Sequence, residues 1–233
     1  GALNGNESLA QRRPAMRDKV AQNIDLLDTE LKGLAIAGEA AALWSDIRQH
    51  WGSLEQGVGS KSLSSPESTK LHTQLVTKVL TLNEYLLAQS GMALDPDADT
   101  YFLIQASLVN MPWLGENLGI MRAQGTGFLA KQEITPEGRG TLAALDKRAR
   151  ELQAEMLRNL TRATDANPEF KDKLLSSGQA QLAAAAKALA LADKALISAT
   201  EINYPAPEYF DEFTRTIDGL YTFNAAAMNA LTE

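Results

Sequence analysis

Apolar side chains recur every three or four positions along almost the whole chain, the spacing that places them on one face of a helix. The pattern predicts helices at about residues 7–33, 38–56, 65–91 and 96–130, and three more with apolar stripes over 142–156, 175–199 and 210–231. It leaves no room for a strand. We therefore expect an all-α fold, an elongated bundle of long antiparallel helices with no β-sheet.

Proline marks the expected start of five helices. An acid follows the proline each time, and four of the five motifs place a capping oxygen before it. The cap satisfies a free amide, proline has none to lose, and the acid faces the positive helix end. The motifs are Ser65-Pro66-Glu67, Asp95-Pro96-Asp97, Thr135-Pro136-Glu137, Asn167-Pro168-Glu169 and Ala206-Pro207-Glu208.

The apolar stripes predict which side chains face inward. In the first helix these are Leu9, Met16, Val20, Leu27, Leu31 and Leu34, and in the third they are Leu71, Leu75, Val79, Leu82 and Leu86. The stretch from Gly57 to Ser64 predicts a flexible exposed loop, and Gly91 is placed to end the third helix.

Pro112 lies inside the helix predicted over 96–130, whose first half is apolar nearly all round. Proline cannot donate to the helical ladder, so we expect a kink or a local break there. Residues 175–199 alternate leucine with glycine or alanine at heptad spacing. That repeat favours close packing inside the bundle, and a dimer seam is the alternative.

Composition limits the classes of partner. The chain has 233 residues, a net charge of -7 and no basic run, which argues against nucleic acid or an anionic membrane surface. No stretch reaches the roughly 18 apolar residues that span a membrane. Cysteine is absent, so there is no disulfide and no thiolate ligand or nucleophile.

Recognised catalytic and metal motifs are also absent from the sequence. His50 and His72 lie in different predicted helices, and we expect His72 to be a boundary residue with a hydrogen bond. Helix capping explains Asp95, Asp97 and Asp99 better than a calcium loop does. We therefore expect no enzyme, no metal and no cofactor.

Polar residues on an apolar face are the candidate ligand contacts, because a buried charge or amide needs a partner. Arg122 lies on the packing stripe that begins at Tyr101, while Asn110 and Asn117 lie on a neighbouring stripe near Trp113. An internal ion pair is the simpler role for Arg122, and binding of an anion is the alternative. The candidate ligand-binding residues are Arg122, Tyr101, Asn110, Trp113 and Asn117.

Residues 71–125 resemble the extracytoplasmic sensor region of bacterial methyl-accepting chemotaxis proteins and related transmembrane histidine kinases. The resemblance rests on an opening His-Thr, a Ser-Gly before an acidic Leu-Asp-Pro motif, and a later Pro-to-Arg-x-x-Gly motif. These are His72, Thr73, Ser90, Gly91, Leu94 to Leu103, Pro112, Leu114, Glu116, Leu118, Gly119, Arg122 and Gly125. The tail from Glu208 to Leu220 is similar to the last helix of such domains.

The resemblance implies one periplasmic sensor domain over residues 1–233, built from two stacked helical sub-bundles. Membrane helices and a signalling module would flank it, and the full receptor would form a homodimer. Residues 2–6 resemble the turn that ends the family's first long helix, which implies that this helix precedes the sequence and adds to the ligand site.

We therefore expect a chemoreceptor domain that binds a small solute, an organic or amino acid carboxylate, and passes a displacement along its helices to the membrane. A sensor domain of a histidine kinase is one alternative. Another is an interaction module that binds a periplasmic solute-binding protein, and a third is a structural bundle that only sets spacing or dimerisation.

Overall fold

The structure is a computed structural model that describes residues 7–232, except for the side chains of residues 8 and 9. Every regular element within 7–232 is helical, which confirms the all-α prediction. The predicted turn at residues 2–6 and the predicted inward position of Leu9 lie outside the described part. The chain divides into two compact units at residues 89 and 90, described separately below as unit 1 and unit 2.

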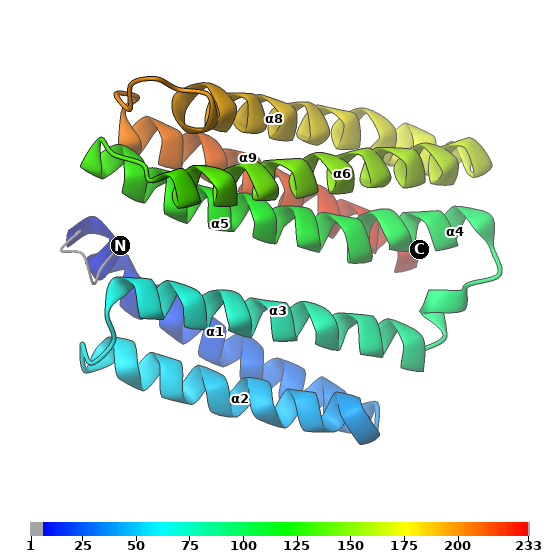
Figure 1. Cartoon of the computed structure of the whole chain (residues 1–233). Coiled ribbons are helices and arrows are strands. Elements are labelled where there is room, and N and C mark those ends of the chain that lie inside the picture. The colour runs from blue at the N-terminus through cyan, green and yellow to red at the C-terminus, as the bar shows by residue number, and fades with distance from the viewer. Residues whose placement is uncertain (1–6, 233) are drawn as a thin grey trace. The chain divides into compact units, whose positions relative to one another are not determined.

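Unit 1 contains three long helices, α1 (Glu7–Gly33), α2 (Gly38–Gly59) and α3 (Ser65–Gln89). Consecutive helices run in opposite directions (Figure 1). Their common core contains Leu31, Ala40, Trp44, Ile47, Leu54, Leu75 and Leu82.

The inward stripe of unit 1 is narrower than predicted. Leu31, Leu75 and Leu82 are buried, but Met16 and Leu34 are 62% and 70% exposed. Val79 is exposed as well, so the inward placement of these last three residues is wrong. A unit with three helices closes around a thin core, and residues at the edge of each stripe remain outside it.

Helix α2 continues through the first part of the predicted flexible loop, ending at Gly59. A Cβ on Gly57 would come within 2.8 Å of the Leu63 side chain, so the turn folds back closely on the helix. The amide of Ser62 donates to the carbonyl of Gly57 at 3.0 Å. The loop prediction is therefore wrong for residues 57–59 and holds for the turn after them. Gly91 has a φ of 80° after α3 ends, as a helix-ending glycine should.

Unit 2 contains four antiparallel helical runs, shown in green, yellow-green, gold and red in Figure 1. A short 3-10 turn η2 (Met92–Leu94) precedes them. The first run comprises α4 (Ala98–Ile104), η3 (Gln105–Asn110) and α5 (Met111–Lys131), and the second is α6 (Pro136–Ala166). The third comprises α7 (Pro168–Phe170), η4 (Lys171–Leu175), α8 (Ser176–Ala192) and η5 (Asp193–Ile197), and the fourth is α9 (Ala206–Thr232).

Two of the predicted caps are confirmed in unit 2. The hydroxyl of Thr135 accepts from the amide of Gly138 at 3.1 Å. The side chain of Asn167 accepts from the amides of Glu169 and Phe170. Each cap satisfies amides that the first helical turn leaves without intrahelical partners.

The other two capping predictions are wrong. Ser64, not Ser65, caps α3, because its hydroxyl oxygen accepts from the amide of Glu67 while its own amide donates to the Glu67 carboxylate, which forms a capping box. Asp95 does not cap the next helix, which begins at Ala98. Its carboxylate instead accepts from the amide two residues further on.

The leucine repeat over 175–199 packs inside unit 2. Leu182, Leu189 and Leu196 are buried in its core together with Ala185 and Ala192. These side chains are buried within the unit, so the repeat packs inside the bundle, as predicted.

The helical ladder changes immediately before Pro112, as predicted. Residues 105–110 form the π-helical segment η3, in which the amide of Met111 donates to the carbonyl of Ala106. Pro112 cannot close the next bond of this i to i+5 register because it has no N–H. The hydroxyl of Ser107 donates to the carbonyl of Leu103 at 2.6 Å, which adds a side-chain bond at this point.

Candidate anion site in unit 2

Arg122 is a half-buried cation between α5 and α9. Its Nη1 donates to the hydroxyl of Thr214 at 2.8 Å. Its guanidinium lies over the ring of Phe210, 5.0 Å from the ring centroid. A guanidinium has five N–H donors, and the Thr214 bond is the one found for it in residues 7–232.

No carboxylate within 4.0 Å pairs with Arg122 in the described part of the chain, so the simpler prediction of an internal ion pair is wrong. Burial lowers the pKa of Arg122, and the nearby charge of Asp218 partly offsets that effect. Asp218 lies one helical turn beyond Thr214 on α9. Arg122 therefore keeps its charge with only a hydroxyl and an aromatic face in direct contact.

A second polar group lies one turn from Arg122 on α5. The hydroxyl of Thr126 is buried and has no hydrogen-bond partner. Positions 122 and 126 share one face of the helix. The arginine donors and this hydroxyl together form the Arg122 site, defined here as Arg122, Thr126, Phe210 and Thr214.

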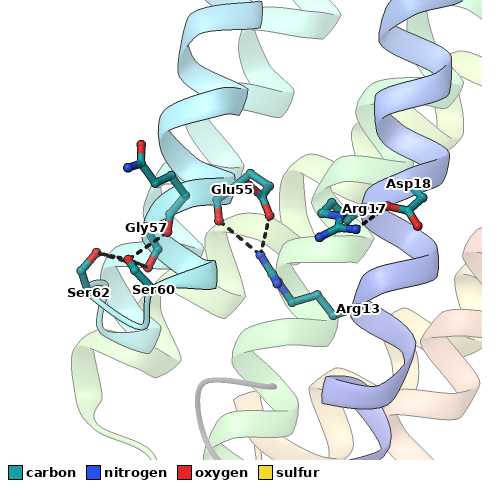
Figure 2. Close-up of polar contacts among 8 residues, drawn as sticks. Arg13, Arg17, Asp18, Glu55, Gly57, Ser60 and Ser62 are labelled. Atoms are coloured by element: carbon teal, nitrogen blue, oxygen red, sulfur yellow. Dashed lines mark hydrogen bonds and ion pairs between the residues drawn. The ribbon is translucent and has the colours of Figure 1, made fainter.

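Several other arginines in the described residues have direct acidic partners. Figure 2 shows Arg13 pointing toward Glu55, with 3.2 Å between guanidinium and carboxylate, and Arg17 paired with Asp18 at 2.7 Å. These two cations at the start of α1 are neutralised by their neighbours. Arg122 differs from these two arginines because no carboxylate contacts its guanidinium directly, although the charge of Asp218 acts on it from further away.

Asn110 bonds to α6, whereas Arg122 bonds to α9. Asn110 is buried, and its Oδ1 accepts from Asn159 of α6 at 2.9 Å. Its Nδ2 donates to Glu155 of the same helix at 3.3 Å. These bonds hold the end of η3 against α6.

Asn117, Trp113 and Tyr101 are also placed by contacts inside unit 2. Asn117 donates to the carbonyl of Trp113 at 2.8 Å, and Tyr101 packs edge-on against Phe102. The other four predicted residues thus do not form one cluster with Arg122. Their role in ligand binding stays a prediction.

Thr126, Phe210, Thr214 and Asp218 belong to the neighbourhood of Arg122 but were not among the predicted residues. Three of them lie on α9, about 90 positions away in sequence, so spacing within one helix could not identify them. The pattern did contain one signal. Phe210 begins the apolar stripe of the last helix, and Thr214 lies one turn further along.

Unit 1 has a shallow groove of about 430 Å³ between α2 and α3, lined by Glu39, Ala42, Leu43, Asp46, Thr81 and Tyr85. Both of its acids already have partners. The hydroxyl of Tyr85 donates to Glu39 at 2.6 Å, and Lys78 pairs with Asp46 at 2.6 Å. This groove offers an anion no free donor comparable with Arg122.

The described residues contain no cluster of three or more histidines or acids that could hold a metal. His72 is exposed and bonds the carbonyl of Ser68 at 2.7 Å, in agreement with its prediction as a boundary residue. Within residues 7–232, no helix has both the length and the hydropathy of a membrane span.

Comparison with known families gave a match over nearly the whole chain. The model of the family NIT, described as nitrate and nitrite sensing, matches residues 1–232. Neither the curated proteins nor the solved structures that were compared gave a match.

Proposed function

The chain belongs to the nitrate and nitrite sensing family of extracytoplasmic sensor domains, and we propose that it binds nitrate or nitrite at the Arg122 site. The observation that carries this proposal is a half-buried guanidinium with no carboxylate within ion-pair distance in the described residues. Such a group is satisfied by an anion that supplies the missing acceptor oxygens.

The shape of the ligand suits this group. Nitrate is a planar monoanion with three oxygens, and a guanidinium presents paired N–H donors in one plane. Two parallel hydrogen bonds to Arg122 would fix such an ion beside Thr214 and Thr126. A small carboxylate has the same charge and a similar pair of oxygens, so it remains the competing ligand class that the sequence favoured.

Signalling follows from where the site lies. Arg122 is on α5, whereas Thr214 and Phe210 are on α9, so a bound anion would change the contact between two long helices. A ligand shifts a conformational equilibrium only through its different affinities for the two states. We infer a periplasmic chemoreceptor domain, homodimeric in its receptor, in which α9 carries the change toward the membrane.

The test is calorimetric titration of nitrate, nitrite and small carboxylates into wild-type protein and into R122A, R122K and R158A. Arg158 is exposed on α6 and controls for the loss of one positive charge. We expect R158A to bind like wild type and R122A to lose binding. R122K should bind much more weakly, because lysine keeps the charge but cannot present the fork.

Thermal unfolding of each variant separates a binding role from a structural one. Nitrate at about 100 times its dissociation constant should stabilise wild type by about 2.7 kcal/mol and leave R122A unchanged. If R122A binds nitrate as well as wild type does, the proposed site is wrong. Binding of carboxylates without nitrate or nitrite would keep the site and change the ligand class.

A further inference from the structure

Asp218 lies beside the Arg122 site without closing it. Thr214 and Asp218 are four residues apart on α9 and therefore face the same way, one turn from each other. Thr214 bonds Arg122 directly at 2.8 Å, whereas Asp218 forms no ion pair with Arg122 within 4.0 Å. The carboxylate is exposed, so solvent reaches it.

This placement has an electrostatic consequence for any anion at Arg122. The ligand would be attracted by the guanidinium and repelled by the carboxylate one turn away. Coulomb energy is proportional to the charge of the ligand, so a dianion is repelled twice as strongly as a monoanion at the same place. The attraction to Arg122 doubles as well, so the contribution of Asp218 is to reduce the advantage that a dianion would otherwise gain from that guanidinium.

We propose that Asp218 is a specificity-determining residue that shifts the selectivity of the Arg122 site toward monoanions, such as nitrate and nitrite, and away from dianions such as sulfate. It does so by charge alone and forms no bond to the ligand. The inference rests on the proposed function of Arg122 and adds a reason for discrimination among oxyanions of similar size.

The experiment measures the dissociation constants of nitrate and sulfate by calorimetry for wild type, D218N and D172N at one fixed ionic strength. Asp172 is exposed in η4, carries the same charge and provides the matched control. Keeping ionic strength fixed matters, since added salt screens exposed charges. A further variant, R122A/D218N, tests whether any gain in affinity depends on Arg122.

We expect D218N to bind nitrate about fivefold more tightly, the size of one screened interaction with an exposed charge. The gain for sulfate should be about the square of that factor, roughly 25-fold, because the ligand charge is doubled. D172N should change both affinities little and equally. The double variant should show no gain.

Equal changes in D218N and D172N, or the same factor for nitrate and sulfate in D218N, would overturn the selective role of Asp218 while leaving the anion site intact. If neither wild type nor D218N binds any anion, the assignment of Arg122 is wrong and this inference fails with it. The two failures are thus distinguished by whether wild type binds nitrate.

Discussion

The ring of Tyr209 occupies the space that a side chain at Gly125 would need. A Cβ placed on Gly125 would lie 2.5 Å from the hydroxyl oxygen of Tyr209. The same hydroxyl donates to the carbonyl of Met121 at 3.2 Å, so the ring is held in place from α9 against α5. This contact brings the two helices of the Arg122 site close together.

Gly125→Ala should therefore destabilise unit 2. Tyr209 is fully buried and tied by its hydrogen bond, so it cannot move away without cost. We expect the free energy of unfolding to fall by about 1 to 3 kcal/mol, the usual effect of overpacking. Chemical denaturation followed by circular dichroism measures it.

Gly127→Ala is the matched control, because a Cβ there meets nothing within 4 Å. Alanine favours a helix over glycine, so this variant should gain up to about 1 kcal/mol. Equal effects of the two substitutions would contradict the packing explanation.

Arg139 stabilises the end of the helical run that closes with η5. Its Nη1 contacts the carbonyl of Leu196 and donates to those of Ile197 and Ala199, both at 2.9 Å. Arg139→Ala would leave these carbonyls without that partner, and we expect a loss of about 1 to 3 kcal/mol. Amide hydrogen exchange over residues 198–205 should also become faster, because the loop loses its anchor.

Arg148→Ala serves as the comparison for Arg139, since it removes an exposed side chain whose ion pair with Glu151 contributes little. We expect a change within about 0.5 kcal/mol. A loss of stability at Arg148 as large as that at Arg139 would show that charge, not carbonyl capping, is responsible.

Glu116 makes stability depend on pH. Burial raises the pKa of its carboxyl to about 7, whereas in the unfolded chain it titrates near 4.5. Between these values the folded protein binds more protons than the unfolded one, so stability falls as pH rises through this window. The cost is absent below about pH 4.5 and fully present above about pH 7.

Glu116→Gln should remove that cost. We expect a gain of about 1 to 2 kcal/mol at pH 8, below the full value of the shift because the side chain is only half-buried, and little change at pH 4. Unfolding curves at both pH values measure it. Glu133→Gln, an exposed control, should leave the free energy of unfolding unchanged at both pH values. An equal effect of Glu116→Gln at pH 4 and pH 8 would refute the linkage.

Asn110 fixes the end of η3 on α6 through its two side-chain bonds. Asn110→Ala should cost about 1 to 3 kcal/mol, because Asn159 and Glu155 each lose a partner in a largely buried place. Asn229→Ala, at an exposed position of α9, should change stability by less than about 0.5 kcal/mol. If Asn110→Ala is as mild as the control, the amide bridge adds nothing to the bundle.

Several elements of the fold could be predicted because the responsible interactions are local. The caps at Thr135 and Asn167 need only a few consecutive residues, and so does the altered ladder before Pro112. Some mistakes were local, such as the caps assigned to Ser65 and Asp95. The flexible loop was predicted from its glycines alone, although Leu63 packs closely against Gly57 and α2 continues to Gly59.

The candidate site shows the same division. The position of Arg122 on the packing stripe that begins at Tyr101 identified it as a partly buried cation. The sequence favoured an internal ion pair, however, and the helix on the other side supplies Thr214 instead of a carboxylate. Register between two helices depends on the packing of groups such as Tyr209 on Gly125, and one helix alone does not contain that information.

By itself, the sequence determined the all-α class, most helix boundaries and the place of Arg122 on a packing stripe, because helical periodicity and capping operate within a few residues. Only the tertiary structure decided which stripe residues are truly buried, which groups surround Arg122, and that Asp218 lies beside it. The burial of the stripe residues in unit 1 depends on how its three helices pack, and the surroundings of Arg122 depend on how α5 meets α9. That contact is set by the shape and volume of side chains far apart in the chain.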